Sequence, residues 1–245
     1  MQLTHLLLID AGNSRIKWAS VQNGVWMKQD SVETGAWNAL RQGLANLPAP
    51  QRIVVSNVAG AEAAQQLHAA FAAWPCAPEF IKASVAQCGV RNNYADPAQL
   101  GSDRWAALIA AWQQVRVACL VVNCGTATTI DALSGAGEFM GGIILPGMDM
   151  MRRSLASGAA QLDAARGSWQ RFPRNTADAV QSGVIQATAG AIRLQYAALA
   201  QPDAPCVLSG GAAGELAQHL NLPLLRVDDL VLRGLQLMAQ ESGQE

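Results

Sequence analysis

The segment from Asp10 to Lys17, Asp-Ala-Gly-Asn-Ser-Arg-Ile-Lys, contains the residue types that hold a phosphate group. A carboxylate at the end of a strand, such as that of Asp10, can bind Mg²⁺ directly or through water. Gly12, Asn13 and Ser14 can donate hydrogen bonds to phosphate oxygens. Lys17 can add a positive charge. An ordinary Asx-type hairpin turn uses the same residue types, so this segment alone leaves both interpretations open.

A second group of reactive residue types is Gly101-Ser102-Asp103-Arg104, near the expected start of a helix. Asp103 could accept a proton from a substrate hydroxyl, and Arg104 could bind a carboxylate through two parallel hydrogen bonds. The alternative is a capped helix with a surface ion pair, because an Asp near a helix start is favourable in any case. Without further context the structural interpretation is preferred.

The elements expected to position the first segment are two strands of a hairpin. Leu6 to Ile9 is a continuous apolar run that meets Asp10, which predicts a buried strand ending in a tight turn. Strand character resumes from Ile16 to Val21, and Asn23-Gly24 then turns the chain into another strand. The phosphate-type segment is therefore expected to form the turn between two paired strands.

The same arrangement occurs again in the second half of the chain. Leu120 to Val122 leads into Asn123-Cys124-Gly125-Thr126 and then into a second strand-like stretch and a Gly-rich turn. In an overlay of the two segments, Asp10 aligns with Asn123, Gly12 with Gly125, Asn13 with Thr126 and Gly24 with Gly137. Two such units in register predict an internal duplication. A nucleotide would then lie between the two turns, where glycine lets backbone N–H groups approach phosphates.

The remaining pattern predicts alternating strands and helices. Strands are expected at 51–58 and 206–209. Helices are expected at 59–74, 97–115, 177–200 and 212–220. Gly210-Gly211, between the last strand and the last helix, could admit a ribose or an adenine or could simply turn the chain.

The composition excludes several functional classes. The chain has 245 residues, 51% hydrophobic and 14% charged, and a formal net charge of −1, which is not typical of a DNA- or RNA-binding surface. The 5 cysteines are odd in number and no pair has CxxC spacing, so neither a disulfide framework nor a zinc site is expected. No stretch approaches the roughly 20 apolar residues of a membrane span, and the apolar run near the N-terminus is too short for a signal peptide. A cytoplasmic protein is expected, with neither a membrane nor nucleic acid as a partner.

Several common catalytic motifs are missing. The sequence contains no GxxxxGK[ST], no dinucleotide-binding GxGxxG, no GxSxG and no HExxH. The three histidines, His5, His68 and His219, are scattered along the chain. We interpret them as surface or structural residues.

Taken together, the motifs occur in a specific order and spacing. The chain resembles type III pantothenate kinase, a member of the acetate and sugar kinase/Hsc70/actin superfamily, from Leu7 to about Leu216. The motifs that carry the resemblance are Asp10-x-Gly12-Asn13-Ser14-x-x-Lys17, Tyr94 before Gly101-Ser102-Asp103-Arg104, Gly125-Thr126-Ala127-x-Thr129-x-Asp131, Gly141-Gly142-x-Ile144-x-Pro146-Gly147 and Asn175-Thr176. The resemblance implies an α/β fold of duplicated ribonuclease H-like (actin-like ATPase) domains, with mixed sheets flanked by helices and a nucleotide cleft between the domains. We expect these domains at 1–117 and 118–245.

The resemblance also implies an activity, the ATP-dependent phosphorylation of pantothenate at its terminal hydroxyl in the first step of coenzyme A biosynthesis. It implies Mg²⁺ and a monovalent cation, K⁺ or NH₄⁺, as cofactors, and a homodimer whose partner chain helps to build the pantothenate pocket. The ATP-binding positions would be Asp10, Ala11, Gly12, Asn13, Ser14, Arg15, Ile16, Lys17 and Thr126, with Asp10 holding Mg²⁺ through water. Asp103 would be the proton acceptor. The pantothenate pocket would be formed by Tyr94, Gly101, Ser102, Asp103, Arg104 and Thr176.

The sequence departs from the family pattern at the second turn. The family usually has an aspartate, a K⁺ ligand, where this chain has Asn123. An amide oxygen can coordinate a cation but lacks the formal charge, so we expect weaker K⁺ affinity or an altered dependence on monovalent cations. Ser14 replaces the usual threonine and keeps the hydroxyl.

Two other functions remain open at this point. The resemblance also covers accessory factors for transcription, so a non-catalytic regulatory role is an alternative. The presence of Asp10, Asp103 and Arg104 favours an active enzyme, because a pseudo-kinase is expected to lose at least one of them. The third hypothesis is a kinase for another small polyol or acid. Tyr94 and the segment 101–104 match the pantothenate kinase pattern rather than a sugar kinase pattern.

Overall fold

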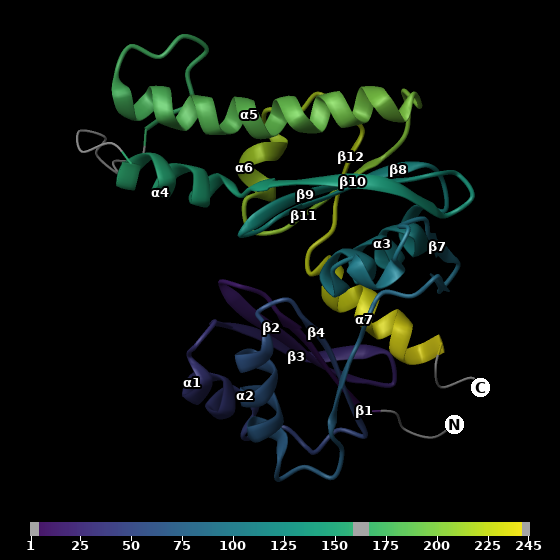
Figure 1. Ribbon diagram of the computed structural model, residues 1–245. Helices are drawn as coiled ribbons and strands as arrows, with labels where there is room; N and C mark the ends of the chain where they lie inside the picture. The colour runs from purple at the N-terminus through teal and green to yellow at the C-terminus, as the bar shows by residue number, and fades with distance from the viewer. Residues whose placement is uncertain (1–4, 159–166, 242–245) are drawn as a thin grey trace. The chain divides into compact units, whose positions relative to one another are not determined.

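The computed structural model describes residues 5–158 and 167–241. The chain forms two compact units (Figure 1): unit 1 consists of Met1–Gln114 and Asp229–Glu245, and unit 2 of Val115–Asp228. The domain ranges expected from the sequence, 1–117 and 118–245, assign the last helix to the second half, whereas its contacts group it with the first. No helix in the described ranges is long and apolar enough to span a membrane.

Unit 1 is built on a sheet with the strand order β3-β2-β1-β4-β5. Its strands are β1 (His5–Ala11), β2 (Arg15–Gln22), β3 (Val25–Glu33), β4 (Arg52–Asn57) and β5 (Pro78–Phe80). The central strand, β1, is antiparallel to β2 and parallel to β4. Leu7 and Ile9 on β1 and Trp18 on β2 are buried in one core cluster. This burial fixes the register, because a slip of one residue would turn the apolar side chains to the other face.

Helices cover this sheet and extend the unit. α1 (Trp37–Leu44) and α2 (Ala61–Phe71) contribute Leu40 and Leu67 to the same core cluster. The other elements of the unit are β6 (Ala86–Gln87), β7 (Val90–Asn92), the 3₁₀ turn η1 (Pro97–Gln99), α3 (Ser102–Val115) and α7 (Leu230–Glu241). A Cβ at Gly234 of α7 would collide with the backbone carbonyl of Ala106 in α3. Glycine therefore lets the two helices approach closely, and α7 also packs against β1 and β4.

Unit 2 repeats the same plan. Its strands follow the order β12-β11-β8-β9-β10. They are β8 (Cys119–Cys124), β9 (Ala127–Leu133), β10 (Glu138–Pro146), β11 (Cys206–Ser209) and β12 (Leu224–Arg226). β8 is antiparallel to β9 and parallel to β11. Its helices are α4 (Met148–Gly158), α5 (Thr176–Leu199) and α6 (Ala213–Ala217). Figure 1 shows α5 running along this sheet, with α4 beside one end of α5.

Most of the expected elements are confirmed, and the differences have local causes. The single helix predicted over 97–115 was wrong in its first turn. The structure instead has η1 and α3, because Leu100 between them is extended, with ψ 126°. The sequence pattern also missed α1 and α7, both amphipathic helices, and the short strands β5, β6, β7 and β12.

Candidate active site

Asp10 lies at the end of β1, where the central strand of unit 1 leads into its hairpin turn. Its backbone is in register with Lys17 on β2 and with Ser56 on β4. Burial raises the pKa of the Asp10 carboxyl to about 7. The negative charges of Asp103 and Asp229 raise this pKa further, whereas the positive charge of Lys17 lowers it. Asp10, Lys17, Asp103 and Asp229 therefore form one charged cluster within unit 1, and a strongly shifted pKa in such a cluster is typical of functional sites.

The turn after Asp10 is held by its backbone. The Gly12 N–H donates to the Arg15 carbonyl (3.0 Å), and the Thr34 N–H donates to the Ser14 carbonyl (3.0 Å). The Thr34 hydroxyl donates to the Gly12 carbonyl at 2.7 Å. A Cβ at Gly12 would lie 3.2 Å from the Arg15 carbonyl oxygen, so a larger residue would strain the turn. Asn13 and Ser14 are exposed at its tip, and a fixed backbone with an exposed tip suits phosphate binding.

The other expected ATP-binding positions of this segment are less available to a ligand. Ala11 and Ile16 are fully buried, so they could offer only backbone groups. The Arg15 guanidinium donates to the Ser31 hydroxyl (2.7 Å) and to the Ser31 carbonyl (3.3 Å). The part of the segment best placed to meet a phosphate is therefore Asn13 and Ser14 together with Lys17, because the Gly12 N–H is already donated to Arg15.

Lys17 has a partner that the sequence did not indicate. Its Nζ lies 3.1 Å from Oδ1 of Asp229, which directly precedes α7. Asp229 has a φ of 53°, in the left-handed region, and its carbonyl accepts the Arg233 N–H of α7 at 3.0 Å. The two side chains are 212 positions apart in the chain. An Asp before an apolar helical stretch predicts a helix start and says nothing of a lysine partner.

Asp103 is the second residue of α3. The Arg104 N–H donates to Oδ1 of Asp103 at 2.8 Å. A Cβ at Gly101 would lie 2.7 Å from the same oxygen, so glycine makes room for the carboxylate. Burial raises the pKa of Asp103, and the hydrogen bond and charge of Arg104 only partly oppose this rise. A carboxylate with a raised pKa is a better proton acceptor than an exposed one.

A buried hydrogen bond ties Asp103 to the strand beside Asp10. The hydroxyls of Ser56 and Ser102 are 2.8 Å apart and both residues are buried. Ser56 is the β4 neighbour of Asp10 and Ser102 begins α3. This contact explains how carboxylates far apart in the sequence come close enough to affect each other's charge.

The two expected substrate-binding residues Arg104 and Tyr94 also meet. Arg104 is only 7% exposed, and its Nη1 donates to the Tyr94 hydroxyl at 3.1 Å. Its guanidinium carbon lies 5.8 Å from the centre of the Tyr94 ring. The Tyr94 N–H donates to Asn92 Oδ1 (3.1 Å), which anchors the loop. A buried guanidinium next to a proton acceptor can bind a substrate carboxylate or another polar group.

The hairpin turn of unit 2 occupies the same position in its sheet as the Asp10 turn does in unit 1, but the residue at the position of Asp10 is neutral. Asn123, the counterpart of Asp10, is in register with Thr129 and with Ser209. The Gly125 N–H donates to the Ala127 carbonyl (3.0 Å), and the Thr126 carbonyl accepts the Gly147 N–H (2.9 Å).

Glycines close the backbone around this second turn. A Cβ at Gly147 would collide with the carbonyl oxygens of Gly125 and Thr126. Gly210, with φ 97°, sits against the backbone of Cys124. Three loops thus converge at the carboxyl end of β8.

Thr176 lies in unit 2, as the first residue of α5. Asn175 is the N-cap of that helix, because its Oδ1 accepts the Asp178 N–H at 2.9 Å. Thr176 lines an apolar cavity of about 690 Å³ together with Met150 and Val180. Its proposed contact with pantothenate, which needs residues of unit 1 as well, stays a prediction.

The donor set fits Mg²⁺ held mainly by its substrate. In the described ranges no three His, Cys, Asp or Glu side chains are grouped to hold a metal. Mg²⁺ in kinases needs only one or two protein carboxylates, because phosphate oxygens and water complete its octahedron. Asp10 could supply one carboxylate at the turn, and the expected binding of a monovalent cation by the amide oxygen of Asn123 stays a prediction.

Comparison with known proteins decides the family. The sequence profile described as type III pantothenate kinase matches residues 6–198. The chain belongs to the type III pantothenate kinase family. A relative with that name from Aromatoleum aromaticum is 51% identical over 239 residues, which cover 97% of this chain and 99% of the relative. Another relative with that name, from Nitrosospira multiformis, is 45% identical, and the alignment covers 98% of this chain and 92% of the relative.

Solved structures share the fold of this family member at low identity. A protein described as a Baf family transcriptional activator, from Campylobacter jejuni, matches with a TM-score of 0.65 and 23% identity, over 98% of this chain and 100% of its own. A protein described as a 2-dehydro-3-deoxygalactonokinase, from Sinorhizobium meliloti, matches with a TM-score of 0.61 and 16% identity. The match covers 97% of this chain and 99% of the Sinorhizobium chain. The fold is the expected α/β fold of duplicated ribonuclease H-like, actin-like domains, in which helices flank mixed sheets.

Proposed function

We propose that this protein transfers the γ-phosphoryl group of ATP to pantothenate, giving 4'-phosphopantothenate and ADP in the first step of coenzyme A biosynthesis. The observation that carries the proposal is the charged cluster of unit 1. There Asp103 lies near Asp10 of the phosphate turn, in a chain of this kinase family. Phosphoryl transfer needs positioned charges and a group that orients the attacking hydroxyl, and it needs no covalent nucleophile from the protein.

Asp103 is the proposed proton acceptor. As the hydroxyl oxygen of pantothenate bonds to the γ-phosphorus, the bond from that phosphorus to the β,γ-bridging oxygen breaks and ADP leaves. The hydroxyl proton passes to Asp103, whose burial raises its pKa and its basicity. Lys17 and the N–H groups at the tip of the 12–14 turn bind phosphate oxygens. Asp10 would hold Mg²⁺, through water, and the ion would supply neutralisation of the phosphate charge.

The pantothenate pocket is proposed to form around Arg104. Its guanidinium suits the substrate carboxylate or another polar group, and Tyr94 orients the guanidinium through the 3.1 Å hydrogen bond. Gly101 leaves space beside Asp103 and Ser102 fixes the start of α3, and Thr176 is proposed as a further substrate-binding residue. The match of Tyr94 and segment 101–104 to the motif of this family favours pantothenate over another acid or polyol.

A monovalent cation, K⁺ or NH₄⁺, is proposed to bind near Asn123. An amide oxygen coordinates such an ion through its dipole alone, so the affinity is expected to be weaker than at an aspartate.

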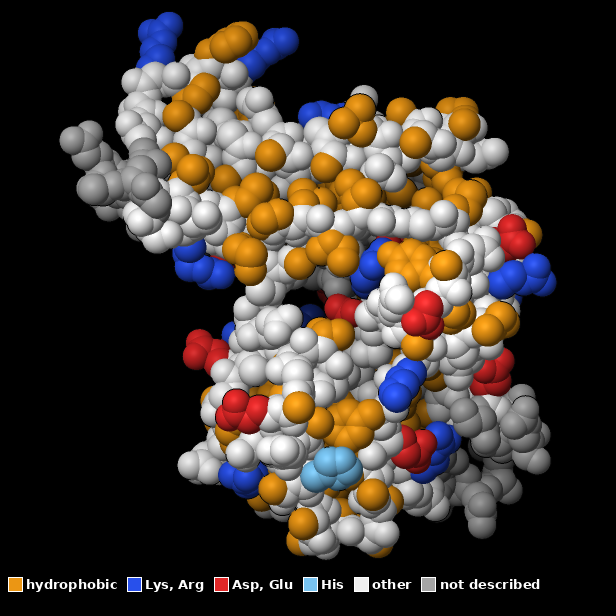
Figure 2. Space-filling view, viewed as in Figure 1, with side chains coloured by type: hydrophobic (Ala, Val, Ile, Leu, Met, Phe, Trp, Pro, Cys, Tyr) orange, Lys and Arg blue, Asp and Glu red, His pale blue; other side chains and the backbone are white. Residues whose placement is uncertain are grey.

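A homodimer is proposed with the substrate pocket near its interface. The support is an apolar surface on unit 2 beside the 690 Å³ cavity that Thr176 lines, with Met150 39%, Leu155 44% and Ile144 62% exposed. Figure 2 shows apolar side chains gathered where α4 and α5 lie.

Leu155→Glu should convert the dimer to a monomer in light scattering after gel filtration. Leu194→Glu, at an exposed position outside that cavity, should leave the dimer intact, and a monomeric wild type would refute the proposal.

A coupled ADP-release assay tests the function directly. We expect turnover with ATP and pantothenate, and none above background with glycerol or acetate in its place. Equal rates with all three acceptors would contradict a pantothenate kinase. No turnover with pantothenate at any K⁺ or NH₄⁺ concentration would instead favour the accessory, transcription-regulatory role. The cytoplasmic location stays a prediction.

A further inference from the structure

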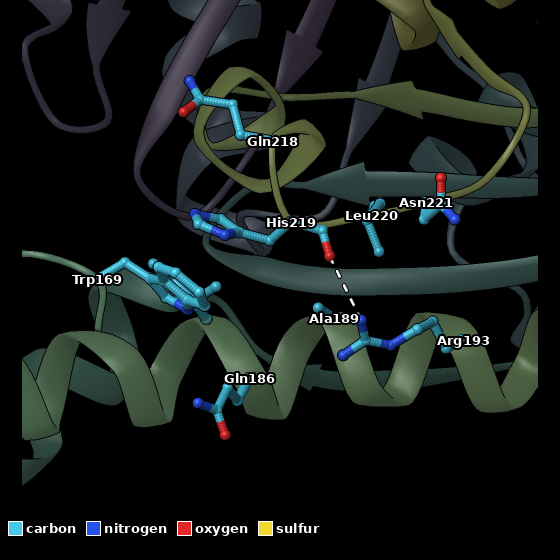
Figure 3. A pocket seen from close by; sticks show the side chains of 9 residues that line it. Trp169, Gln186, Ala189, Arg193, Gln218, His219, Leu220 and Asn221 are labelled. Atoms are coloured by element: carbon cyan, nitrogen blue, oxygen red, sulfur yellow. Dashed lines mark hydrogen bonds between the residues drawn. The ribbon is translucent and has the colours of Figure 1, made fainter. Parts of the chain in front are cut away.

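Unit 2 contains a groove that none of the proposed catalytic, ATP-binding, metal-binding or pantothenate-binding residues line. It has a volume of about 390 Å³ and lies between α5 and the segment that follows α6 (Figure 3). Its lining residues are Trp169, Ile185, Gln186, Ala189, Arg193, Gln218, His219, Leu220 and Asn221. We refer to it as the Trp169 groove.

The groove exists because a small residue lies between long ones. Gln186, Ala189 and Arg193 are spaced i, i+3 and i+7, so they share one face of α5. Ala189 is buried and cannot fill the space between its two long neighbours. Ile185 and Leu220, both buried, give the floor an apolar character. Seven residues of helix span about 10 Å, which sets the length of the groove along α5.

One end of the groove is aromatic. Trp169 is 44% exposed, and the centre of its ring lies 5.0 Å from that of the His219 ring, with an angle of 36° between the ring planes. The loop is fastened to α5 by its backbone. The Ser168 N–H donates to Asp178 Oδ1 (2.7 Å), and the Gln170 N–H donates to the buried Ser182 hydroxyl (2.8 Å). The indole is thus held in place while much of it remains accessible.

The rest of the groove is polar and cationic. The Arg193 guanidinium makes one long hydrogen bond, 3.4 Å, to the His219 carbonyl, which Figure 3 draws as a dashed line. Within residues 5–158 and 167–241 no carboxylate forms an ion pair with it. Gln186, Gln218 and Asn221 are polar residues that line the same space. A cation without an acidic partner, beside an exposed ring and several amides, is a combination suited to an anionic, flat ligand.

We propose that the Trp169 groove binds a small ligand that joins a flat heteroaromatic ring to an anionic group, of the mononucleotide class. The ring stacks on Trp169, the anion pairs with Arg193, and the amides bond to polar atoms of the ring and sugar. This chemistry is separate from the charged cluster of unit 1, so the site would be a second one on the chain.

Nuclear magnetic resonance of the full chain tests the proposal, with adenosine 5'-monophosphate as the probe. The chain has 7 tryptophans and hence seven indole N–H signals, and the variant Trp169→Phe assigns the relevant one. We expect that signal to shift with saturation in the millimolar range or below. Adenosine, without the anion, and ribose 5-phosphate, without the ring, should each bind about tenfold more weakly or worse.

The variant Arg193→Gln should weaken the response of the Trp169 signal about tenfold. Arg153→Gln, at an exposed position on α4, is the matched control and should leave it unchanged. Binding of the probe at the phosphate turn would shift signals of unit 1 residues instead, so the two binding sites can be distinguished in the same spectra. The proposal is overturned if the Trp169 signal does not respond up to about 5 mM, or if Arg193→Gln or removal of the anion leaves the response intact. Neither result depends on pantothenate turnover.

Discussion

The hairpin turns of the two units occupy the same position in their sheets and differ in charge. Asp10 and Asn123 each end the first strand of a hairpin, each with an antiparallel neighbour and a parallel one. The parallel neighbour is a serine in both units, Ser56 beside Asp10 and Ser209 beside Asn123. The duplication predicted from the overlay is therefore visible in the strand pairing.

The difference lies in what surrounds each turn. Around Asp10 are Lys17, Asp103 and Asp229, which shift its pKa. Around Asn123, glycines let three loops close on the end of β8. One copy of the duplicated unit thus carries a cluster of charged side chains at its turn, and the other carries a tightly packed backbone. Substitutions in either turn test this contrast.

Asp103→Asn removes the proposed proton acceptor and keeps the shape of the side chain. We expect kcat to fall about 10²–10⁴-fold, with ATP binding by calorimetry largely unchanged. Asp96→Asn is the control, because an Asn can still accept the Ala98 N–H at the start of η1. A kcat equal to that of the wild type would show that Asp103 is not the base.

Gly147→Ala tests the packed backbone of the second turn. The new Cβ would collide with two carbonyl oxygens, and we expect a loss of about 2–3 kcal/mol in the free energy of unfolding. In Gly190→Ala the Cβ meets nothing within 4 Å in α5, so that variant should gain up to about 1 kcal/mol. Urea denaturation measures both, and equal stability of the two variants would contradict the contrast.

The pair Lys17 and Asp229 tests the charged turn. If Asp229 acts by holding Lys17 for phosphate, Lys17→Met and Asp229→Asn each raise KM for ATP about tenfold, and the double variant is no worse than Lys17→Met alone. Additive effects would mean that Asp229 serves only the start of α7. Asp228→Asn, next to it and paired with Arg226 at 3.8 Å, should change KM little.

Asp10→Asn tests the cost of burying the carboxyl. The folded protein holds the Asp10 proton up to a pKa of about 7, against the ordinary 3.8. The wild type without ligands therefore loses stability as the pH rises from about 4 to about 7, and the loss is complete above that range. The variant avoids this loss, so its gain in Tm should be larger at pH 8 than at pH 5. A gain that does not depend on pH would refute the shifted pKa.

Asn123→Asp makes the second turn resemble the first. An added carboxylate should strengthen monovalent cation binding, so that the K⁺ concentration for half-maximal activity falls severalfold. The same titration with NH₄⁺ identifies which ion the site prefers. Saturation of the wild type at very low K⁺ would show that the amide is sufficient, against our expectation.

The sequence was enough to predict the family and the elements that carry local signals. Apolar strands next to Asp10 and Asn123, the Asn-Gly turn and the long alanine-rich α5 are recognisable because their patterns lie within a few residues. The family prediction is confirmed by the match over residues 6–198, and so is the duplicated α/β fold. The roles of the individual site residues stay predictions.

Only the tertiary structure brought Asp229 to Lys17 and joined Ser56 to Ser102. These pairs are separated by 212 and 46 positions, and no local pattern encodes such a distance. The same holds for the break at Leu100 and for the placement of α7, which depends on Gly234 approaching Ala106. Propensity and periodicity describe neighbours along the chain, whereas charge pairing and desolvation depend on which distant side chains share a space.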